Sequence, residues 1–412
     1  MKEHKKALSL IILALTAVLV NACGTPTPTA PPVSTLALIN GILIDGTGSE
    51  PIPNAAIVIK DGLIFDVGPR EKVSIPADAQ IIDVNGGTIL PGFINAHVHT
   101  AFDVSNLRTW AQAGVTTVRD LGTYIERHHS WNKWWKEIAE GRELPTPYPF
   151  PLAKAYSSIP SNARLVTSGP IVTIPNGYPA SAFEFGPDLA FNVTSPEDAR
   201  QKINWLLDNG ADVIKIVLFG KQGLSLEEAK AVVDVAHERG TIVTAHIQTA
   251  DALDIGLEAK IDDSAHLVTE YLPDEIITQM VAQDLYIVPT LALIEAYYGS
   301  LGSGADNLRR FVAAGGKVAL GDDYSNQGIK LGMPIRDMEL MEESGMTPMQ
   351  IIIAATQNGA HVCNLEDQLG TLKVGKKADL LVVDGDPLQD IHALTKAQWV
   401  IRDGRLIRSP ND

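Results

Sequence analysis

The sequence predicts an α/β chain in which a (β/α)₈ TIM barrel is joined to a small β-sandwich domain built from both ends of the mature chain. Three observations lead to this prediction. Short apolar segments broken by turn residues occur near both ends, strand-like and helix-like segments alternate between them, and ionisable side chains stand at the ends of several predicted strands. The expected limits are 36–90 with 368–412 for the β domain and 91–367 for the barrel.

The composition is that of an ordinary globular protein with an acidic balance. The 412 residues are 45% hydrophobic and 20% charged, with a formal net charge of −16. This length can bury a large core. No basic stripe occurs in the sequence, so nucleic acid is not expected as a partner.

The first residues have the pattern of an export signal followed by a tether. Lys2, Lys5 and Lys6 precede an apolar run over 7–20, which is short for a membrane span but typical of a signal peptide. The next four residues, VNAC, resemble a bacterial lipobox. We therefore expect a signal peptide over 1–22, a lipidated Cys23 and a Thr/Pro-rich tether over 23–35. The chain is then exported and held at the bacterial cell envelope by a lipid anchor on the membrane; the alternative is a secreted or periplasmic protein with an incidental cysteine.

Hairpin signals mark the β segments at both ends. Asn40-Gly41 and Asp61-Gly62 follow apolar runs in the first segment, and Asp403-Gly404 does so in the last. Asn-Gly and Asp-Gly between apolar strands favour tight hairpin turns. The two segments are expected to form one sheet domain.

Strands and helices alternate through the middle of the chain. Strands are expected at 213–217, 241–245, 264–265, 285–288 and 317–320, and helices at 225–239, 273–283, 305–314 and 347–360. Ser225 and Thr347 are expected to cap two of these helices. Repeated βα units fit either a barrel or a doubly wound sheet.

Ionisable residues at the predicted strand ends decide between these two folds. His97 and His99 alternate on one strand and point to the same side, an arrangement that suits metal chelation. Alone, such a pair is better explained by core histidines. Further along stand Lys215 within an apolar strand, and His246, His266 and Asp323 after three others. Such ends converge on one rim of a barrel, so we choose the barrel.

This ordered set resembles the amidohydrolase superfamily, and more narrowly its imidazolonepropionase-like and Xaa-Pro dipeptidase-like branch. The residues that carry the resemblance are His97, His99, Lys215, His246, His266 and Asp323. Two further phrases support it, GVTTVRD at 114–120 and GTLKVGKKADL at 370–380. The resemblance covers about 36–407.

The resemblance implies a centre of two divalent metal ions. His97, His99 and Asp323 would hold one ion, His246 and His266 the other, and a carbamate formed from CO₂ on Lys215 would bridge them. Zn²⁺ is the leading candidate, with Mn²⁺ or Co²⁺ as alternatives. A bridging hydroxide would attack the substrate, and Asp323 would act as general base and then acid. Asp322 would face away from the ions.

Two regions are candidates for substrate contact. The long segment 121–168 holds His128, His129, Trp131, Trp134 and Trp135. It could form an aromatic lid, although packing of most of these tryptophans on the barrel is the simpler interpretation. In addition, Tyr178 and Tyr271 could each orient a substrate group.

The expected function is hydrolysis of a carbon–nitrogen bond in a small molecule, such as a dipeptide, a cyclic amide or another acyl-amine. Hydrolysis of an ester, carbamate or phosphotriester at the same site is an alternative within enzymes. A lipid-anchored binding protein without turnover is an alternative of another class. The sequence also leaves room for a homo-oligomer.

Overall fold

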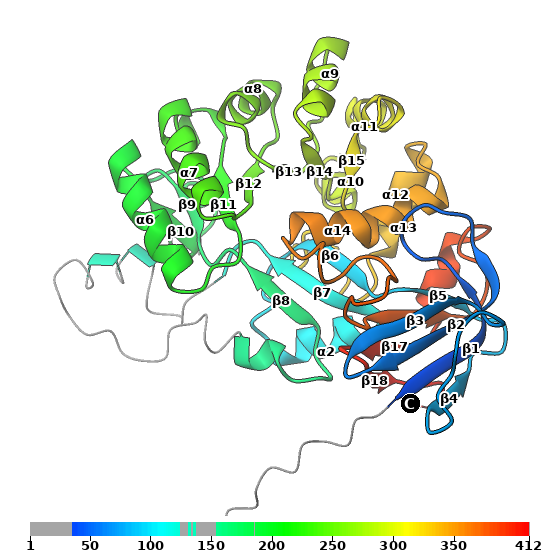
Figure 1. Cartoon of the computed structure of the whole chain (residues 1–412). Coiled ribbons are helices and arrows are strands. Elements are labelled where there is room, and N and C mark those ends of the chain that lie inside the picture. The colour runs from blue at the N-terminus through cyan, green and yellow to red at the C-terminus, as the bar shows by residue number, and fades with distance from the viewer. Residues whose placement is uncertain (1–34, 124–130, 133–134, 137–153, 185, 412) are drawn as a thin grey trace, which may run out of the picture. The chain divides into compact units, whose positions relative to one another are not determined.

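The computed structural model describes residues 35–411, apart from 124–130, 133–134, 137–153 and 185 (Figure 1). The predicted signal peptide, Cys23 and nearly all of the tether lie outside the described residues, as do His128, His129 and Trp134. Among the helices that are described, none has the length and apolar character needed to span a bilayer.

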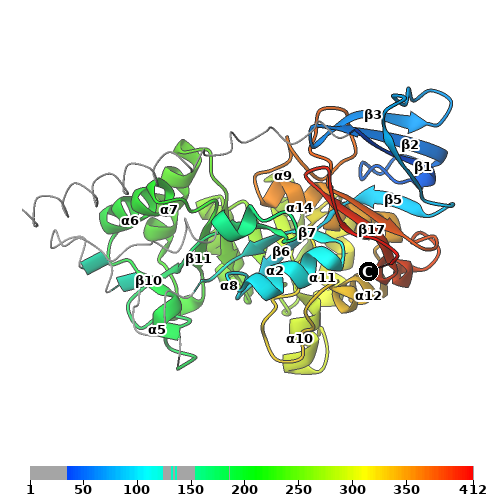
Figure 2. The same ribbon diagram turned by 90° about the horizontal axis from the view of Figure 1, so that it is seen from below.

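Strands from both ends of the chain form one eight-stranded sheet. Its order is β18-β17-β16-β5-β1-β2-β3, with β4 paired to β1, and Figures 1 and 2 both show the N-terminal and C-terminal strands side by side. The two ends meet where β5 and β16 pair antiparallel, with Leu90 opposite Leu381. The sandwich expected from the sequence is not confirmed, and these strands form one hydrogen-bonded sheet. The strands are β1 (Leu36–Leu43), β2 (Ile52–Lys60), β3 (Leu63–Pro69), β4 (Gln80–Asp83), β5 (Thr88–Pro91), β16 (Leu380–Val383), β17 (Ala397–Arg402) and β18 (Arg405–Arg408).

Two of the three predicted hairpin turns are present. Asp61-Gly62 joins β2 to β3 and Asp403-Gly404 joins β17 to β18, all four residues with positive φ. Asn40-Gly41 instead lies inside β1 at a register shift. A Cβ at Gly41 would approach Ile89 to 2.7 Å, so this glycine permits close packing within the sheet and does not turn the chain.

The middle of the chain forms two parallel sheets, and a single closed barrel is not observed. One sheet has the order β6-β7-β8 and the other β10-β9-β11-β12-β13-β14-β15. Backbone hydrogen bonds connect their margins: Ala96 N donates to Leu320 O at 2.7 Å and Asp323 N to His97 O at 2.9 Å at one margin, and Asp212 N donates to Thr167 O at 2.8 Å at the other. The strands are β6 (Phe93–Val98), β7 (Val115–Asp120), β8 (Arg164–Thr167), β9 (Ile171–Thr173), β10 (Ala190–Asn192), β11 (Ile214–Val217), β12 (Val243–His246), β13 (Asp263–Ala265), β14 (Tyr286–Val288) and β15 (Lys317–Val318).

Helices cover the parallel strands, and five of the described helices start with a capping side chain, namely α2, α6, α7, α8 and α13. Ser225 and Glu228 form a capping box at the start of α7, and Thr347 and Gln350 form another at α13, as the sequence predicts. Figure 1 shows α6, α7 and α8 on the side of β11 and β12 away from β6 and β7. The helices are α2 (Val104–Gln112), α5 (Gly186–Leu189), α6 (Pro196–Asp208), α7 (Leu226–Glu238), α8 (Ala250–Ala259), α9 (Asp274–Ala282), α10 (Leu291–Tyr298), α11 (Gly304–Ala313), α12 (Ile335–Glu343), α13 (Pro348–Ala355) and α14 (Gln357–Val362).

A buried arginine joins the parallel strands to the composite sheet. Arg164 on β8 donates to the carboxylate of Asp379 at 2.7 Å and to that of Asp403 at 2.6 Å. Asp379 also accepts the backbone N–H of Asp403 at 2.8 Å. Charge-assisted hydrogen bonds of this kind are stronger than neutral ones, so they fix the last strands against the sheet that carries the first predicted site residues.

Candidate active site

The His-x-His pair and Asp323 form a compact cluster at the end of β6. His97 and His99 both approach Asp323, with His99 Nε2 3.0 Å and His97 Nε2 3.5 Å from its Oδ1. One ligand atom from each of the three residues lies within 4.8 Å of the others. Asp323 has a positive φ of 59°, a strained backbone conformation that recurs at functional sites.

Three more predicted residues arrive from neighbouring strands. His246 ends β12, and His266 follows β13 with its Nε2 2.9 Å from His246 Nδ1. The rings of His97 and His266 are 4.9 Å apart, which connects the two groups of histidines. Lys215 on β11 is 2% exposed, and its Nζ has no hydrogen-bond partner among the described residues.

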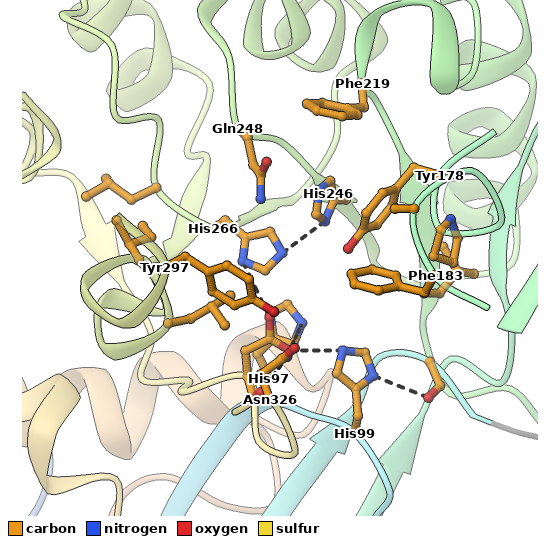
Figure 3. A pocket seen from close by; sticks show the side chains of 18 of the residues that line it. His97, His99, Tyr178, Phe183, Phe219, His246, Gln248, His266, Tyr297 and Asn326 are labelled. Carbon is orange, nitrogen blue, oxygen red and sulfur yellow. Dashed lines mark hydrogen bonds and ion pairs between the residues drawn. The ribbon is translucent and has the colours of Figure 1, made fainter. Parts of the chain in front are cut away.

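All six predicted site residues line one cavity of about 550 Å³. Figure 3 shows the four imidazoles gathered around this cavity, with His246 and His266 facing His97 and His99. The parallel strands present their carboxyl ends to the same space, and this arrangement brings together residues that are far apart in sequence. The geometry is the one that the sequence predicts, although the strands do not form one closed barrel.

Burial controls the protonation of the site. Burial, followed by the Lys215 charge, lowers the pKa of His97 and of His246 well below 6.5. Burial and the neighbouring His246 do the same for His266. Burial would also lower the pKa of His99, but the hydrogen bond and charge of Asp323 raise it. Neutral imidazoles retain the lone pair that a metal ligand needs.

Lys215 departs most from its usual behaviour. Burial lowers its pKa from 10.5 to about 7, although the negative charges of Asp323 and Asp263 act to raise it. A buried ammonium without a hydrogen-bond acceptor is costly, so the side chain sits in surroundings suited to a neutral amine or a modified one. Three atoms have no hydrogen-bond partner within the part of the chain that the structure describes, namely Lys215 Nζ, His246 Nε2 and His97 Nδ1, and all three fit a centre that binds cations.

The two adjacent aspartates have different surroundings. Asp323 lines the cavity, whereas Asp322 does not. Asp322 accepts hydrogen bonds from Asn95 Nδ2 at 2.8 Å and from Tyr324 N at 3.1 Å. Burial raises the pKa of Asp322 to about 7. The geometry therefore agrees with the choice of Asp323 as the residue that faces the histidines.

Residues outside the predicted set hold the imidazoles in place. Thr290 Oγ1 lies 2.8 Å from His266 Nδ1, and the carbonyl of Gly122 lies 3.2 Å from His99 Nδ1. Partners of this kind fix the tautomer and orientation of a ligating histidine. No pattern in the sequence indicates Thr290, because its role depends on a positive φ of 48° at the start of α10. Helix α10 itself was not predicted.

A buried ion pair lies between strands on either side of the site. Arg119 on β7 forms two hydrogen bonds with Asp263 on β13, at 2.8 and 2.9 Å, and both side chains are fully buried. Arg119 also donates to the carbonyls of Ala96 and Val362. Because these bonds satisfy the charged groups, the pair can hold strands of the two parallel sheets together without leaving a free charge.

The two predicted tyrosines have different positions. Tyr178 lines the cavity, and its ring stacks on His246 with a centroid distance of 4.4 Å. Tyr271 is not among the cavity-lining residues; it is 62% exposed and stacks against the guanidinium of Arg310. A substrate contact for Tyr271 therefore has no support from the geometry, because the residue's position after the His266 strand did not determine where its side chain points.

The described tryptophans of the long segment pack on the protein core. Trp131 lies 6.5 Å from Phe191 and 6.4 Å from Trp205, and Trp135 lies at 5.8 and 6.0 Å from the same two rings. Neither tryptophan lines the cavity. Their contacts favour the packing interpretation over a lid for these two residues.

Comparisons with known proteins agree with the fold and with the resemblance predicted from the motifs. The model of the amidohydrolase family matches residues 88–406. Ochratoxinase from Aspergillus niger is 25% identical over 424 residues, covering 90% of this chain and 86% of the relative. Imidazolonepropionase from Geobacillus kaustophilus is 24% identical over 401 residues, covering 86% and 90%. A crystal structure from Bifidobacterium longum, of a protein assigned as a prolidase, has a TM-score of 0.74 and 28% identity, covering 92% of this chain and 96% of that one.

The α/β fold with histidines and an aspartate gathered at the strand ends occurs here in a chain that matches a family of hydrolases. The family match covers most of the chain, so the protein belongs to the amidohydrolase family.

Proposed function

We propose that this protein is a metal-dependent hydrolase that cleaves a carbon–nitrogen bond in a small molecule. One observation carries the proposal: six ionisable side chains on or after five strands line one cavity, and the lysine among them is buried without a hydrogen-bond partner among the described residues. The names of the relatives, ochratoxinase and imidazolonepropionase, support a hydrolase of this family.

The donor set fits two divalent cations. His97, His99 and Asp323 would hold one ion, and His246 and His266 the other. Imidazole and carboxylate ligands suit Zn²⁺ first, with Mn²⁺ or Co²⁺ as alternatives. Bound ions of this kind lower the pKa of water and polarise a substrate carbonyl.

Lys215 is proposed to carry the ligand shared by both ions. A neutral amine attacks the carbon of CO₂, forms a nitrogen–carbon bond and loses one proton, which leaves an anionic carbamate. The pKa of about 7 keeps much of this amine neutral near physiological pH. The product would replace an unpartnered nitrogen by oxygen atoms that can bind cations.

Asp323 is proposed to move the proton during hydrolysis. Its Oδ1 lies within 3.5 Å of both His97 and His99, so it is held at the cluster and not directed to solvent. It would accept a proton from the attacking water and deliver it to the leaving nitrogen. Tyr178 is a candidate donor to the substrate oxygen, because burial raises its pKa and keeps its hydroxyl protonated.

Metal content and turnover test this proposal together. Protein supplied with Zn²⁺ and bicarbonate should hold about two ions per chain by elemental analysis and should hydrolyse members of a panel of dipeptides, cyclic amides and N-acyl amines. His246→Ala should lose metal and activity. His237→Ala is the matched control, because His237 lies on α7 and pairs with Asp262 away from the cavity.

The same experiment separates the alternatives when esters, carbamates and phosphotriesters are added to the panel. Turnover of esters, carbamates or phosphotriesters without amide cleavage would replace the proposed reaction by the second candidate. Protein without bound metal or turnover would be a binding protein that has kept the fold.

We also propose that Cys23 carries a lipid that anchors the exported chain at the cell envelope. The basic residues, apolar run and VNAC sequence before the tether support this location. Expression with labelled palmitate should label the wild type but not Cys23→Ser. Equal labelling of both proteins would contradict the proposal.

A further inference from the structure

The cavity has few charged groups besides those of the predicted centre. Among the described residues that line it, Lys215 is the one cation other than histidine, and Asp323 and Glu270 are the anions. Glu270 is exposed, and its Oε2 accepts the N–H of Ala250 at the start of α8 at 2.8 Å. Lys215 and Asp323 belong to the predicted centre. Glu270 is therefore the one other charged residue, histidines aside, among the described cavity-lining residues that could face the part of a substrate beyond the reacting bond.

Aromatic rings form one wall of the cavity. Tyr178 lies 5.9 Å from Phe183 and 6.0 Å from Phe219, and Phe219 lies 5.9 Å from His246. These edge-on contacts are typical of stable aromatic clusters. The wall begins next to the histidines and continues away from them, so it can contact the part of a substrate beyond the reacting bond (Figure 3).

Helix α10 supplies the opposite wall. Leu293, Ile294, Tyr297 and Tyr298 all line the cavity. Tyr297 and Tyr298 are 58% and 67% exposed. Figure 3 places Tyr297 across from Tyr178 and Phe183, with the imidazoles between them. Two walls of this kind suit a flat apolar group, which would cover ring surface that is now in contact with water.

Charge complementarity separates neutral from anionic substrates. A carboxylate remote from the scissile bond would lie between aromatic walls and near Glu270, without a described arginine or lysine to pair with it. Placing a charge where it lacks a partner is unfavourable, and the nearby anion adds repulsion.

We propose, on the basis of the proposed hydrolase function, that the substrates are amides with an uncharged aryl or similarly apolar group, and that a free carboxylate on this group is selected against. Phe219 and Tyr297 are the specificity-determining residues for this group. The proposed preference differs from that expected for cleavage of dipeptides, which end in a carboxylate.

A matched pair of anilides tests the charge preference. We expect kcat/KM for acetanilide to exceed that for 4-acetamidobenzoate by roughly tenfold or more, since an ionised carboxylate changes the basicity of the leaving aniline little and the two amides differ mainly in charge. Equal rates, or faster cleavage of the carboxylate, would overturn the inference.

Binding is measured separately from turnover, so that the charge preference can be tested even if the protein cleaves no amide. Calorimetry with 4-nitroaniline and 4-aminobenzoate should give tighter binding of the neutral compound. If the metal-loaded protein cleaves no amide, the proposed function fails, while these two affinities still support or contradict the inference.

Two sets of variants locate the preference. Phe219→Ala and Tyr297→Ala should raise KM for acetanilide several-fold more than for N-methylacetamide; equal effects on both amides would contradict the assigned roles. Gln222 lines the cavity, so Gln222→Arg should improve kcat/KM for 4-acetamidobenzoate. Lys221→Gln is the control on the same short turn, outside the cavity lining, and should leave the ratio of the two anilides unchanged. A changed ratio in this control would place the selecting charge at Lys221 and overturn the proposal.

Discussion

Replacing Lys215 with methionine should stabilise the metal-free protein while removing its capacity to bind metal and to turn over. The lysine residue is 2% exposed, and none of the described residues forms a hydrogen bond with its amine. Methionine keeps a long unbranched side chain of similar shape without a titratable group. The substitution therefore isolates the cost of burying the amine.

The size of this cost follows from the change in pKa on folding. The unfolded lysine has a pKa near 10.5, and burial lowers it to about 7 in the folded protein. The unfolded state binds more protons between these values, so stability rises with pH across this window. The penalty is about 4 kcal/mol at pH 7 and about 1.5 kcal/mol at pH 9.5.

Urea unfolding of chelator-treated protein at both pH values measures this difference. Lys215→Met should be more stable than the wild type at pH 7, and the gap should narrow at pH 9.5. With Zn²⁺ and bicarbonate present the order should reverse, because ligand binding stabilises the wild type alone. The reasoning would be refuted if Lys215→Met had an unfolding free energy equal to or below that of the metal-free wild type at pH 7, and if the difference between the two proteins did not change with pH.

Three further predictions concern single side chains. Asp323→Asn should lower kcat by roughly a hundredfold or more, since the amide cannot accept the proton; circular dichroism should show an unchanged fold, and full turnover would exclude the assigned role. Thr290→Val should weaken metal binding roughly 10- to 100-fold by removing the partner of His266, as a competition titration would measure; unchanged affinity would count against it. Asp379→Asn should destabilise the protein by about 2–4 kcal/mol at pH 7 by breaking its buried pair with Arg164. Burial alone would raise the pKa of Asp379, but the Arg164 charge outweighs this effect and lowers the pKa. The difference in unfolding free energy between wild type and variant should therefore shrink as the pH falls below 3.8 and through the pKa of folded Asp379. A difference that stays constant during acid denaturation would contradict the pairing.

The positions of the candidate site residues could be predicted because strand ends are visible in the sequence. His246 ends β12 and His266 directly follows β13, and parallel strands bring such ends to one edge whatever the exact closure of the sheet. The closure itself depends on backbone hydrogen bonds between β6, β8 and the segments that flank them, which no residue pattern encodes. The sequence therefore predicts a closed barrel that the structure does not show, whereas the six predicted site residues do lie around one cavity.

The walls of the cavity could not be predicted for a related reason. Helix α10 is apolar over most of its length, without the periodic polar face that identifies a helix in a sequence. Its first turn also depends on Thr290 in a left-handed conformation, which the residue type does not favour. Tyr271 shows the opposite error, because it stands shortly after a strand end in the sequence and yet packs against Arg310 on the surface.

The pairing of β5 with β16 determines when the chain can complete its fold. The hydroxyl of Thr88 donates to the carbonyl of Gly385, a contact across 297 residues. During synthesis the first strands are exposed long before their partner leaves the ribosome, and β5 then presents an unsatisfied edge to any other extended segment. A nascent chain stopped before residue 380 keeps this edge open, so loss of the last tenth of the protein should cause aggregation and not merely a shortened product.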